Sequence, residues 1–194
     1  MNMLTQPKLT FTPEDLLTMP NGDDYELVDG HLLERRMGMR SGRIAGRIGL
    51  LIGNFCEANK AGTYLPADVS YQCFPSAPTK VRRPDVSFLA AGRIPAGQEP
   101  EGHCLLAPDL VTEVVSPNDE FEEVVEKVEE WLAAGVRLVW LVSPRTRTIW
   151  VYRRGGSGLL LREKDDLTGE DVLPGFRCTV REIFLPPPGV ANPS

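Results

Sequence analysis

The segment DLVTEVVSPNDEFEEVVEKVEEWLAAGVRLVWLVS, residues 109–143, decides the fold class. Residues 109–116 are apolar enough to form a strand in the middle of a sheet. Helix-capping residue types follow, and apolar side chains then recur on one helix face up to Gly135. That face consists of Phe121, Val124, Val125, Val128, Trp131 and Leu132. Because residues 137–143 are again strand-like, we expect a strand, an amphipathic helix and a strand in succession.

Further strands are expected on both sides of this segment. TYLPADVSYQCF (residues 63–74), DVSFLA (residues 85–90) and RTIWVYRR (residues 147–154) are rich in the β-branched and aromatic residues that favour strands. The remaining C-terminal sequence predicts a hairpin and a short helix near residues 179–184.

The N-terminal part predicts a helix, a hairpin and a long helix. TPED at residues 12–15 is typical of a helix start, which places a short helix at residues 12 to 19. YELVDGHLLER, residues 25–35, predicts two paired strands around the turn dipeptide Asp29-Gly30. Helical spacing then runs from Ser41 to Asn59.

Four glycines fall on one face of this predicted long helix: Gly42, Gly46, Gly49 and Gly53. Because glycine destabilises a helix interior, such a face indicates close approach to a neighbouring element. A phosphate-binding loop is the less favoured interpretation. The order of the predicted elements fits an α/β (α+β) fold with a mixed sheet flanked by helices.

The chain of 194 residues has the composition of an ordinary globular protein, with 42% hydrophobic and 25% charged residues. We expect one domain over residues 1–185 and a disordered proline-rich tail over residues 186–194. No apolar run reaches the roughly 18 residues of a membrane helix. The first residues do not resemble a signal peptide, so we expect a cytoplasmic protein with no membrane partner.

Cysteine and histidine usage argues against several site classes. The four cysteines form no CxxC pair, so neither a zinc site nor a disulfide framework is expected, and we interpret them as reduced core residues. The two histidines form no metal-binding pattern, and neither a GxSxG nor a GxxxxGK[ST] motif occurs. The net charge of −6 opposes loose binding to nucleic acid, so a polyanionic substrate needs local help, which a divalent cation can provide.

Four charged residues occupy positions that need an explanation: Glu26, Asp85, Glu113 and Lys127. Glu113 lies in a strand that should be buried, so its carboxylate must be paired, metal-bound or protonated. An ion pair with an arginine is the simpler alternative for Glu113. For Asp85 the alternative is turn chemistry beside a proline.

Two carboxylates at the ends of neighbouring strands form a plausible Mg²⁺ site, because Mg²⁺ takes one or two carboxylates and keeps several waters. A nearby lysine can lower the pKa of water or stabilise charge on phosphate. We expect Asp85 and Glu113 to supply the carboxylates. Lys127 lies at the rim of the apolar helix face and can reach them, although a solvent-exposed pairing with Glu123 or Glu130 is the alternative.

Five motifs together resemble the Uma2 family, also called DUF820, of restriction-endonuclease-like proteins in the PD-(D/E)xK nuclease superfamily. They are YELVDG, RRPDVSF, APDLVTEVVSPND, EKVEEWLAAGVRLVWLVSP and LPGF, in this order between residues 25 and 176. The resemblance covers residues 10 to 185 and implies a restriction-endonuclease-like core.

The resemblance also implies roles for single residues. Asp85 matches the metal-binding aspartate of the superfamily, Glu113 its second acidic ligand, and Glu26 the N-terminal acidic position of the family. Val115 stands where the superfamily lysine is expected, two residues after Glu113. In this family a lysine on the following helix takes that place, and Lys127 matches it.

The sequence therefore predicts a Mg²⁺- or Mn²⁺-dependent endonuclease that hydrolyses nucleic acid, with DNA and a homodimer as the expected partner and assembly. Asp85 and Glu113 would hold the metal, Glu26 would assist as a further ligand or orient water, and Lys127 would position the attacking water. Two alternatives stay open: a non-catalytic homo-oligomeric binding or assembly protein that retains the nuclease fold, and a metal-dependent hydrolase of small phosphorylated molecules.

Overall fold

The computed structural model describes residues 10–35, 37–95, 98–117 and 119–186. A six-stranded mixed sheet forms its centre, with the strand order β3-β4-β5-β6-β7-β8. Its strands are β3 (Gly62–Pro66), β4 (Val86–Ala90), β5 (Leu110–Val114), β6 (Leu138–Ser143), β7 (Thr148–Arg153) and β8 (Gly158–Leu161). Only β5 and β6 pair in parallel among the neighbours in this sheet, and the other pairs are antiparallel.

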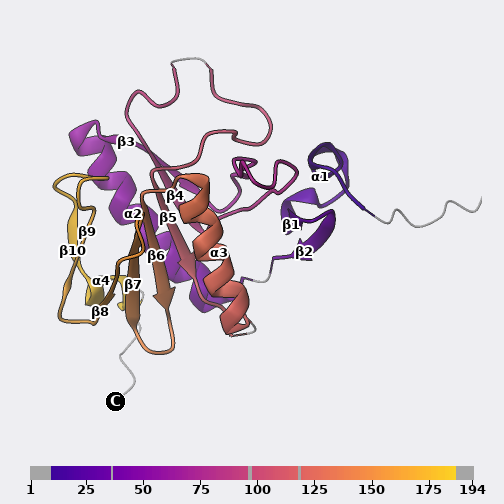
Figure 1. Cartoon of the computed structure of the whole chain (residues 1–194). Helices are drawn as coiled ribbons and strands as arrows, with labels where there is room; N and C mark the ends of the chain where they lie inside the picture. Colours follow the sequence, from indigo (N-terminus) through magenta and orange to yellow (C-terminus); the bar gives the residue numbers. More distant parts are fainter. Residues whose placement is uncertain (1–9, 36, 96–97, 118, 187–194) are drawn as a thin grey trace, which may run out of the picture.

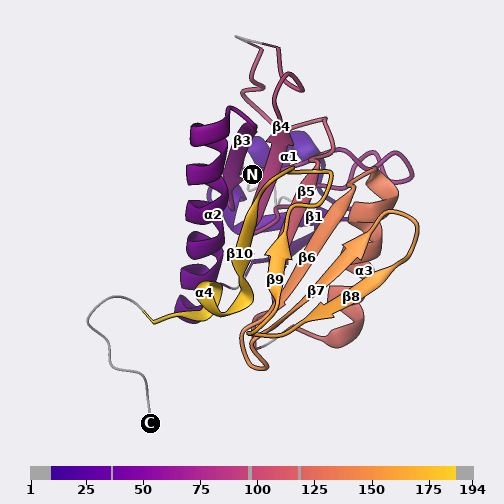
Figure 2. The same ribbon diagram turned by 90° about the vertical axis from the view of Figure 1, so that its left-hand side faces the viewer.

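Two helices cover opposite faces of the sheet (Figures 1 and 2). Helix α2 (Met39–Asn59) covers one face, and α3 (Phe121–Ala134), which connects β5 to β6, covers the other. Side chains alternate between the two faces along a strand. Leu110 and Val114 of β5 therefore pack on the α2 side and Val111 on the α3 side, which directs Glu113 toward α3.

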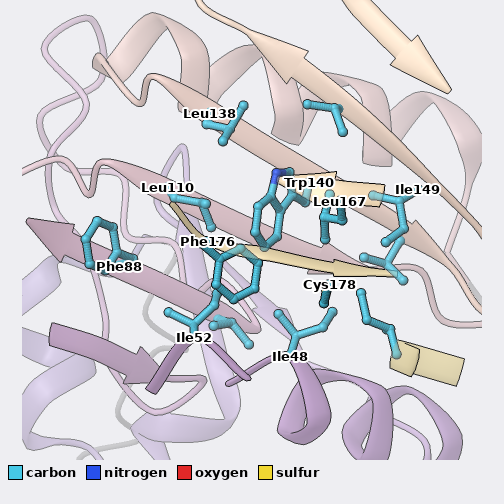
Figure 3. Packing of buried hydrophobic residues seen from close by; sticks show 14 of the residues in the cluster. Ile48, Ile52, Phe88, Leu110, Leu138, Trp140, Ile149, Leu167, Phe176 and Cys178 are labelled. Carbon is cyan, nitrogen blue, oxygen red and sulfur yellow. The ribbon is translucent and has the colours of Figure 1, made fainter. Parts of the chain in front are cut away.

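The core on the α2 side also includes the C-terminal elements. Here β9 (Asp166–Thr168) pairs with β10 (Arg177–Thr179), and α4 (Val180–Phe184) follows. Figure 3 shows Ile48 and Ile52 of α2 near Trp140 and Phe176, whose ring centroids lie 5.8 Å apart. All four side chains are buried, so this layer fixes α2 against the sheet.

The N-terminal elements form a separate small unit beside the sheet (Figure 1). They are α1 (Pro13–Thr18), the 3₁₀ turn η1 (Gly22–Asp24), β1 (Tyr25–Val28) and β2 (His31–Glu34). The β1–β2 hairpin is a two-stranded sheet of its own, and an isolated bridge joins Leu27 to Val81. Leu16, Leu27 and Val81 form its small buried cluster.

The order and type of the predicted elements are confirmed, and so is the mixed sheet flanked by helices. One expectation was largely wrong, because only residues 63–66 of the predicted strand at residues 63–74 belong to a strand, β3. Farther along, Tyr71 makes only isolated bridges, to Arg82 and Cys104. The rings of Tyr71 and Phe74 instead pack against Trp131 of α3, so the apolar side chains serve the core without continuous pairing.

Two finer expectations were wrong in part. Phe121 does not share the buried face of α3 but is 76% exposed, because it begins the helix. Of the four glycines in α2, Gly49 and Gly53 lie against the ring of Tyr64, whereas a Cβ added at Gly46 would meet no atom of another element within 4 Å. A Cβ at Gly49 would lie 2.7 Å from that ring, so the close approach requires glycine there.

The four cysteines are buried and free, as predicted. In the part of the chain that the structure describes, no helix is long and apolar enough to cross a membrane. Residues 187–194 of the predicted tail lie outside the described residues.

Candidate active site

A pocket of about 280 Å³ lies at the carboxyl end of β5, between the β1–β2 hairpin and α3. All four predicted site residues line it: Glu26, Asp85, Glu113 and Lys127. They come from four different segments of the chain, so the fold brings together residues that the sequence keeps apart.

Asp85 directly precedes β4, which runs antiparallel to β5. The start of β4 therefore lies beside the end of β5, and the backbone N–H of Val114 donates to Asp85 Oδ2 over 2.6 Å. Burial raises the pKa of Asp85 above its ordinary range, although Lys127 and the Val114 N–H act in the opposite direction. Turn chemistry beside the proline therefore does not fully explain Asp85, because this residue also lines the pocket.

Glu113 in β5 is 7% exposed and faces α3. The indole Nε1–H of Trp131 donates to its Oε1 over 2.7 Å, and Lys127 Nζ lies 3.0 Å from its Oε2. Burial raises the pKa of Glu113 to about 7, and the neighbouring charge of Asp85 adds to this effect. The two strand-end carboxylates therefore repel each other inside one pocket.

Glu26 in β1 is held by donors on both oxygens. Its Oε1 accepts from the backbone N–H of Arg83 at 2.8 Å and lies 3.0 Å from Lys127 Nζ, while Oε2 accepts from Arg82 at 2.9 Å. Burial alone would raise the pKa of Glu26, but Lys127 and Arg82 lower it to about 2. Glu26 is therefore a fixed carboxylate anion at neutral pH.

Lys127 in α3 places its ammonium between Glu26 and Glu113, at 3.0 Å from each. Burial opposes the charged form, but the two carboxylates raise the pKa of Lys127 above its ordinary value. Lys127 is therefore a cation and hydrogen-bond donor at neutral pH, and it cannot accept a proton as a general base. The alternative pairing with Glu130 is wrong, because Glu130 pairs with Lys80 and Arg82.

Other residues that were not predicted from the sequence support these four. Arg82 is 7% exposed and joins two elements, since its NH1 contacts Glu26 and its Nε donates to Glu130 of α3 over 2.8 Å. Trp131 was assigned to the core, but its indole N–H also orients Glu113. The two consecutive arginines before Asp85 were the available signal, because buried arginines need carboxylate partners.

The donor set fits a divalent cation at two carboxylates but not at three. Among the described residues, no group of three or more His, Cys, Asp or Glu side chains is arranged to hold a metal ion. Glu26 and Glu113 both have donors on both oxygens, but the donors of Glu26 lower its pKa to about 2. Asp85 and Glu113 instead have raised pKa values that a bound cation would relieve. Two carboxylates suffice for Mg²⁺, which keeps several waters. The role of Glu26 as a further ligand stays a prediction.

Comparison with known proteins matches the chain to one family model and to a solved structure. A family model described as "Uma2: Putative restriction endonuclease" matches residues 13–181. The crystal structure of a "putative nuclease belonging to DUF820" from Anabaena variabilis superimposes with a TM-score of 0.75 at 19% sequence identity. The match covers 90% of this chain and 97% of that one, so the two share a fold. No curated protein matched the sequence.

Proposed function

This chain belongs to the Uma2 family, and from that premise we propose that it is a Mg²⁺- or Mn²⁺-dependent endonuclease that hydrolyses phosphodiester bonds in nucleic acid. The observation that carries the proposal is the position of Lys127, whose ammonium lies in the same pocket as Asp85 and Glu113. The ammonium of Lys127, beside two carboxylates with raised pKa values, can stabilise the negative charge that develops on phosphate during hydrolysis.

Each residue has a distinct proposed task. Asp85 and Glu113 are the residues that would hold the metal ion, and when bound the ion would supply positive charge to the phosphate and to an attacking water. Lys127 would donate a hydrogen bond to that water or to a phosphate oxygen. Glu26 would hold the Lys127 ammonium in place, since it contacts it at 3.0 Å.

The arrangement of charges also bears on the alternatives. A non-catalytic assembly protein needs the four charged groups only as structural ion pairs. The raised pKa values of Asp85 and Glu113 are not explained by such a role. Two like charges close together destabilise the fold, and a purely structural network gains nothing from them. Groups perturbed by burial and by a neighbouring charge in a pocket are typical of functional sites. This observation favours the enzyme over the scaffold.

Calorimetric titration with Mg²⁺ and Mn²⁺ tests the metal site. Asp85→Asn is the sharpest variant, because asparagine retains an oxygen for the Val114 N–H and loses the charge. We expect the parent to bind one cation and the variant to bind it at least about tenfold more weakly, which corresponds to about 1.4 kcal/mol.

Cleavage is measured in parallel on a supercoiled plasmid and on circular single-stranded DNA, since circles have no ends and report endonuclease activity alone. The parent should cleave at least one of the two circular substrates, and only when the metal is present. Asp85→Asn should cleave neither. A parent that binds no metal and opens no circle would return the protein to the assembly alternative. We also propose that the protein is a homodimer, and sedimentation of the same samples should then give the mass of two chains.

A further inference from the structure

The cationic side chains that line the pocket differ in whether they are already neutralised. Four are found among the described residues: Arg35, Arg82, Arg83 and Lys127. Arg82 and Lys127 each contact two carboxylates, as described above. Arg83 is 2% exposed and contacts Asp23 at 2.9 Å as well as backbone carbonyls. These three cations are therefore engaged within the protein.

Arg35 is different. It follows β2 directly, and its backbone N–H donates to the carbonyl of Asp24 over 2.8 Å, which fixes the main chain. Its guanidinium makes one long hydrogen bond of 3.4 Å, to the carbonyl of Asp23. Its charge acts on Asp85 at longer range, but among the described residues it has no carboxylate at ion-pair distance. A partly exposed arginine with free donors at a pocket is suited to bind a phosphate group.

The hairpin face that carries Arg35 also carries apolar surface. Leu33 is paired with Glu26 across the hairpin, so both side chains point to the same face, and alternation places Arg35 there too. Leu33 is 44% exposed and Met37 43% exposed, and both line the pocket with Arg35. An exposed apolar surface beside a free guanidinium offers contacts to a base and to its phosphate.

The opposite wall of the pocket is acidic. Asp119, Glu123 and Glu126, at and near the start of α3, line it. These three carboxylates repel phosphates, whereas on the hairpin side Glu34 lines the pocket beside Arg35, so we expect a nucleic acid to lie on the hairpin side. A duplex carries one charge per about 1.7 Å along its axis and is repelled more strongly than a single strand. Bases in a duplex are also stacked, and their faces cannot contact Leu33 or Met37.

We propose that Arg35 binds a phosphate of an unpaired nucleotide whose base packs on Leu33 and Met37, so that this site takes single-stranded nucleic acid in preference to duplex. The inference rests on the proposed nuclease function and adds the substrate class to it. Because all three side chains are outside the metal-binding pair, their contribution can be measured without cleavage.

The test is the binding of a fluorescent single-stranded oligonucleotide, and of the matching duplex, by the full-length protein in chelator at several low salt concentrations. Arg35→Gln should weaken single-strand binding at least tenfold and reduce the salt slope by about 0.7, the value for one lost phosphate contact. Leu33→Asn should weaken binding about threefold or more with an unchanged slope. Arg177→Gln removes the same charge from an exposed arginine of β10, and it should bind like the parent.

Binding and cleavage outcomes separate the two hypotheses. If the parent opens circular DNA with Mg²⁺ but Arg35→Gln binds single strands as tightly as the parent, this inference is wrong and the nuclease stands. If single-strand binding depends on Arg35 while no circle is opened, the binding site is supported and the nuclease is not. Equal or tighter binding of the duplex by the parent would overturn the proposed preference.

Discussion

The ammonium nitrogen of Lys127 lies 3.0 Å from Oε2 of Glu113, although one residue belongs to α3 and the other to β5. Because α3 follows β5 directly in the sheet crossover, a lysine on the helix can reach the strand carboxylate. Val115, where the superfamily pattern places the lysine, lies in the same pocket without a charge. The cation therefore reaches this site from the helix instead of from the strand.

Replacement of Lys127 by methionine should separate catalysis from metal binding. We expect Lys127→Met to lower kcat about 10²–10³-fold, as for the loss of one oriented donor. Metal affinity should stay equal or rise, because a positive charge beside Asp85 and Glu113 is lost. Stability should fall by about 1–3 kcal/mol, since Glu26 and Glu113 each lose a partner. Cleavage kinetics, calorimetry and urea denaturation measure the three effects.

Lys80→Met is the matched control for Lys127→Met. Lys80 is a comparably buried lysine that pairs with Glu130 and does not line the pocket. It should keep parental kcat while removing the same charge. Parental cleavage by Lys127→Met would instead assign Lys127 a structural role.

Glu26→Gln decides whether Glu26 is a metal ligand or a residue that positions Lys127. The partners of Glu26 already lower its pKa to about 2, so a cation would gain little there and we expect metal affinity within about twofold of the parent. Cleavage should fall at least tenfold, because the ammonium of Lys127 loses one of its two anchors, about 1.4 kcal/mol in the barrier. Calorimetry and initial rates on one protein preparation provide both values. A loss of metal affinity as large as that of Asp85→Asn would make Glu26 a ligand.

Glu113 and Glu26 should contribute to the stability of the metal-free protein with opposite pH dependences. The raised pKa of Glu113, from 4.5 to about 7, means that the folded protein holds this proton more tightly. Its contribution to stability is therefore lost as pH rises from 4.5 to 7, by an amount on the order of 3 kcal/mol. The lowered pKa of Glu26, about 2, gives a contribution that is present above 4.5 and is lost as pH falls.

Urea denaturation in chelator between pH 3 and 8, at intervals of about one unit, measures both slopes. Glu113→Gln should flatten the decline between pH 4.5 and 7 and leave the acid limb intact. Glu26→Gln should weaken the acid limb. An unchanged decline in Glu113→Gln would show that another group titrates there.

Arg82 should be one of the most sensitive positions for stability. Its guanidinium joins Glu26 of the hairpin to Glu130 of α3, with side-chain exposures of 8%, 7% and 13%. Arg82→Met removes one of the two cationic partners of each buried carboxylate, since Glu26 keeps Lys127 and Glu130 keeps Lys80. We expect a loss of about 3–5 kcal/mol. Arg177→Met, which breaks an exposed pair with Asp166, should cost less than about 1 kcal/mol. Similar losses in both variants would contradict a special role for Arg82.

Most of the fold could be predicted from the sequence because the local signals agree with the tertiary structure. The Asp29-Gly30 dipeptide forms the hairpin turn, with φ angles of 50° and 78°, and Gly135 ends α3 in the left-handed region. The strand prediction around Tyr71 was wrong because aromatic side chains indicate burial, and a buried residue need not lie in a strand. The sequence predicts the local β1–β2 pair but does not show the order of the strands in the six-stranded sheet.

The candidate site was predicted less completely. Glu113 is detectable because a carboxylate in an apolar strand must have a partner. Glu26 and Lys127 were assigned by resemblance to a family, since neither helical nor strand periodicity links residues in different elements. The bridge from Arg82 to Glu130 was not predicted because an ion pair between distant segments leaves no mark on local spacing.

The β1–β2 hairpin is not part of the main sheet, so the site residues are distributed over two units that can separate from each other. A partial opening that releases residues 25–35 would remove Glu26, Leu33 and Arg35 together and leave Asp85 and Glu113 on the sheet. Such openings occur below the free energy of global unfolding. Amide protons of β1 should therefore exchange with solvent deuterium earlier than those of β5, and a bound oligonucleotide should slow β1 exchange most. Substrate binding and hairpin closure would then be the same event.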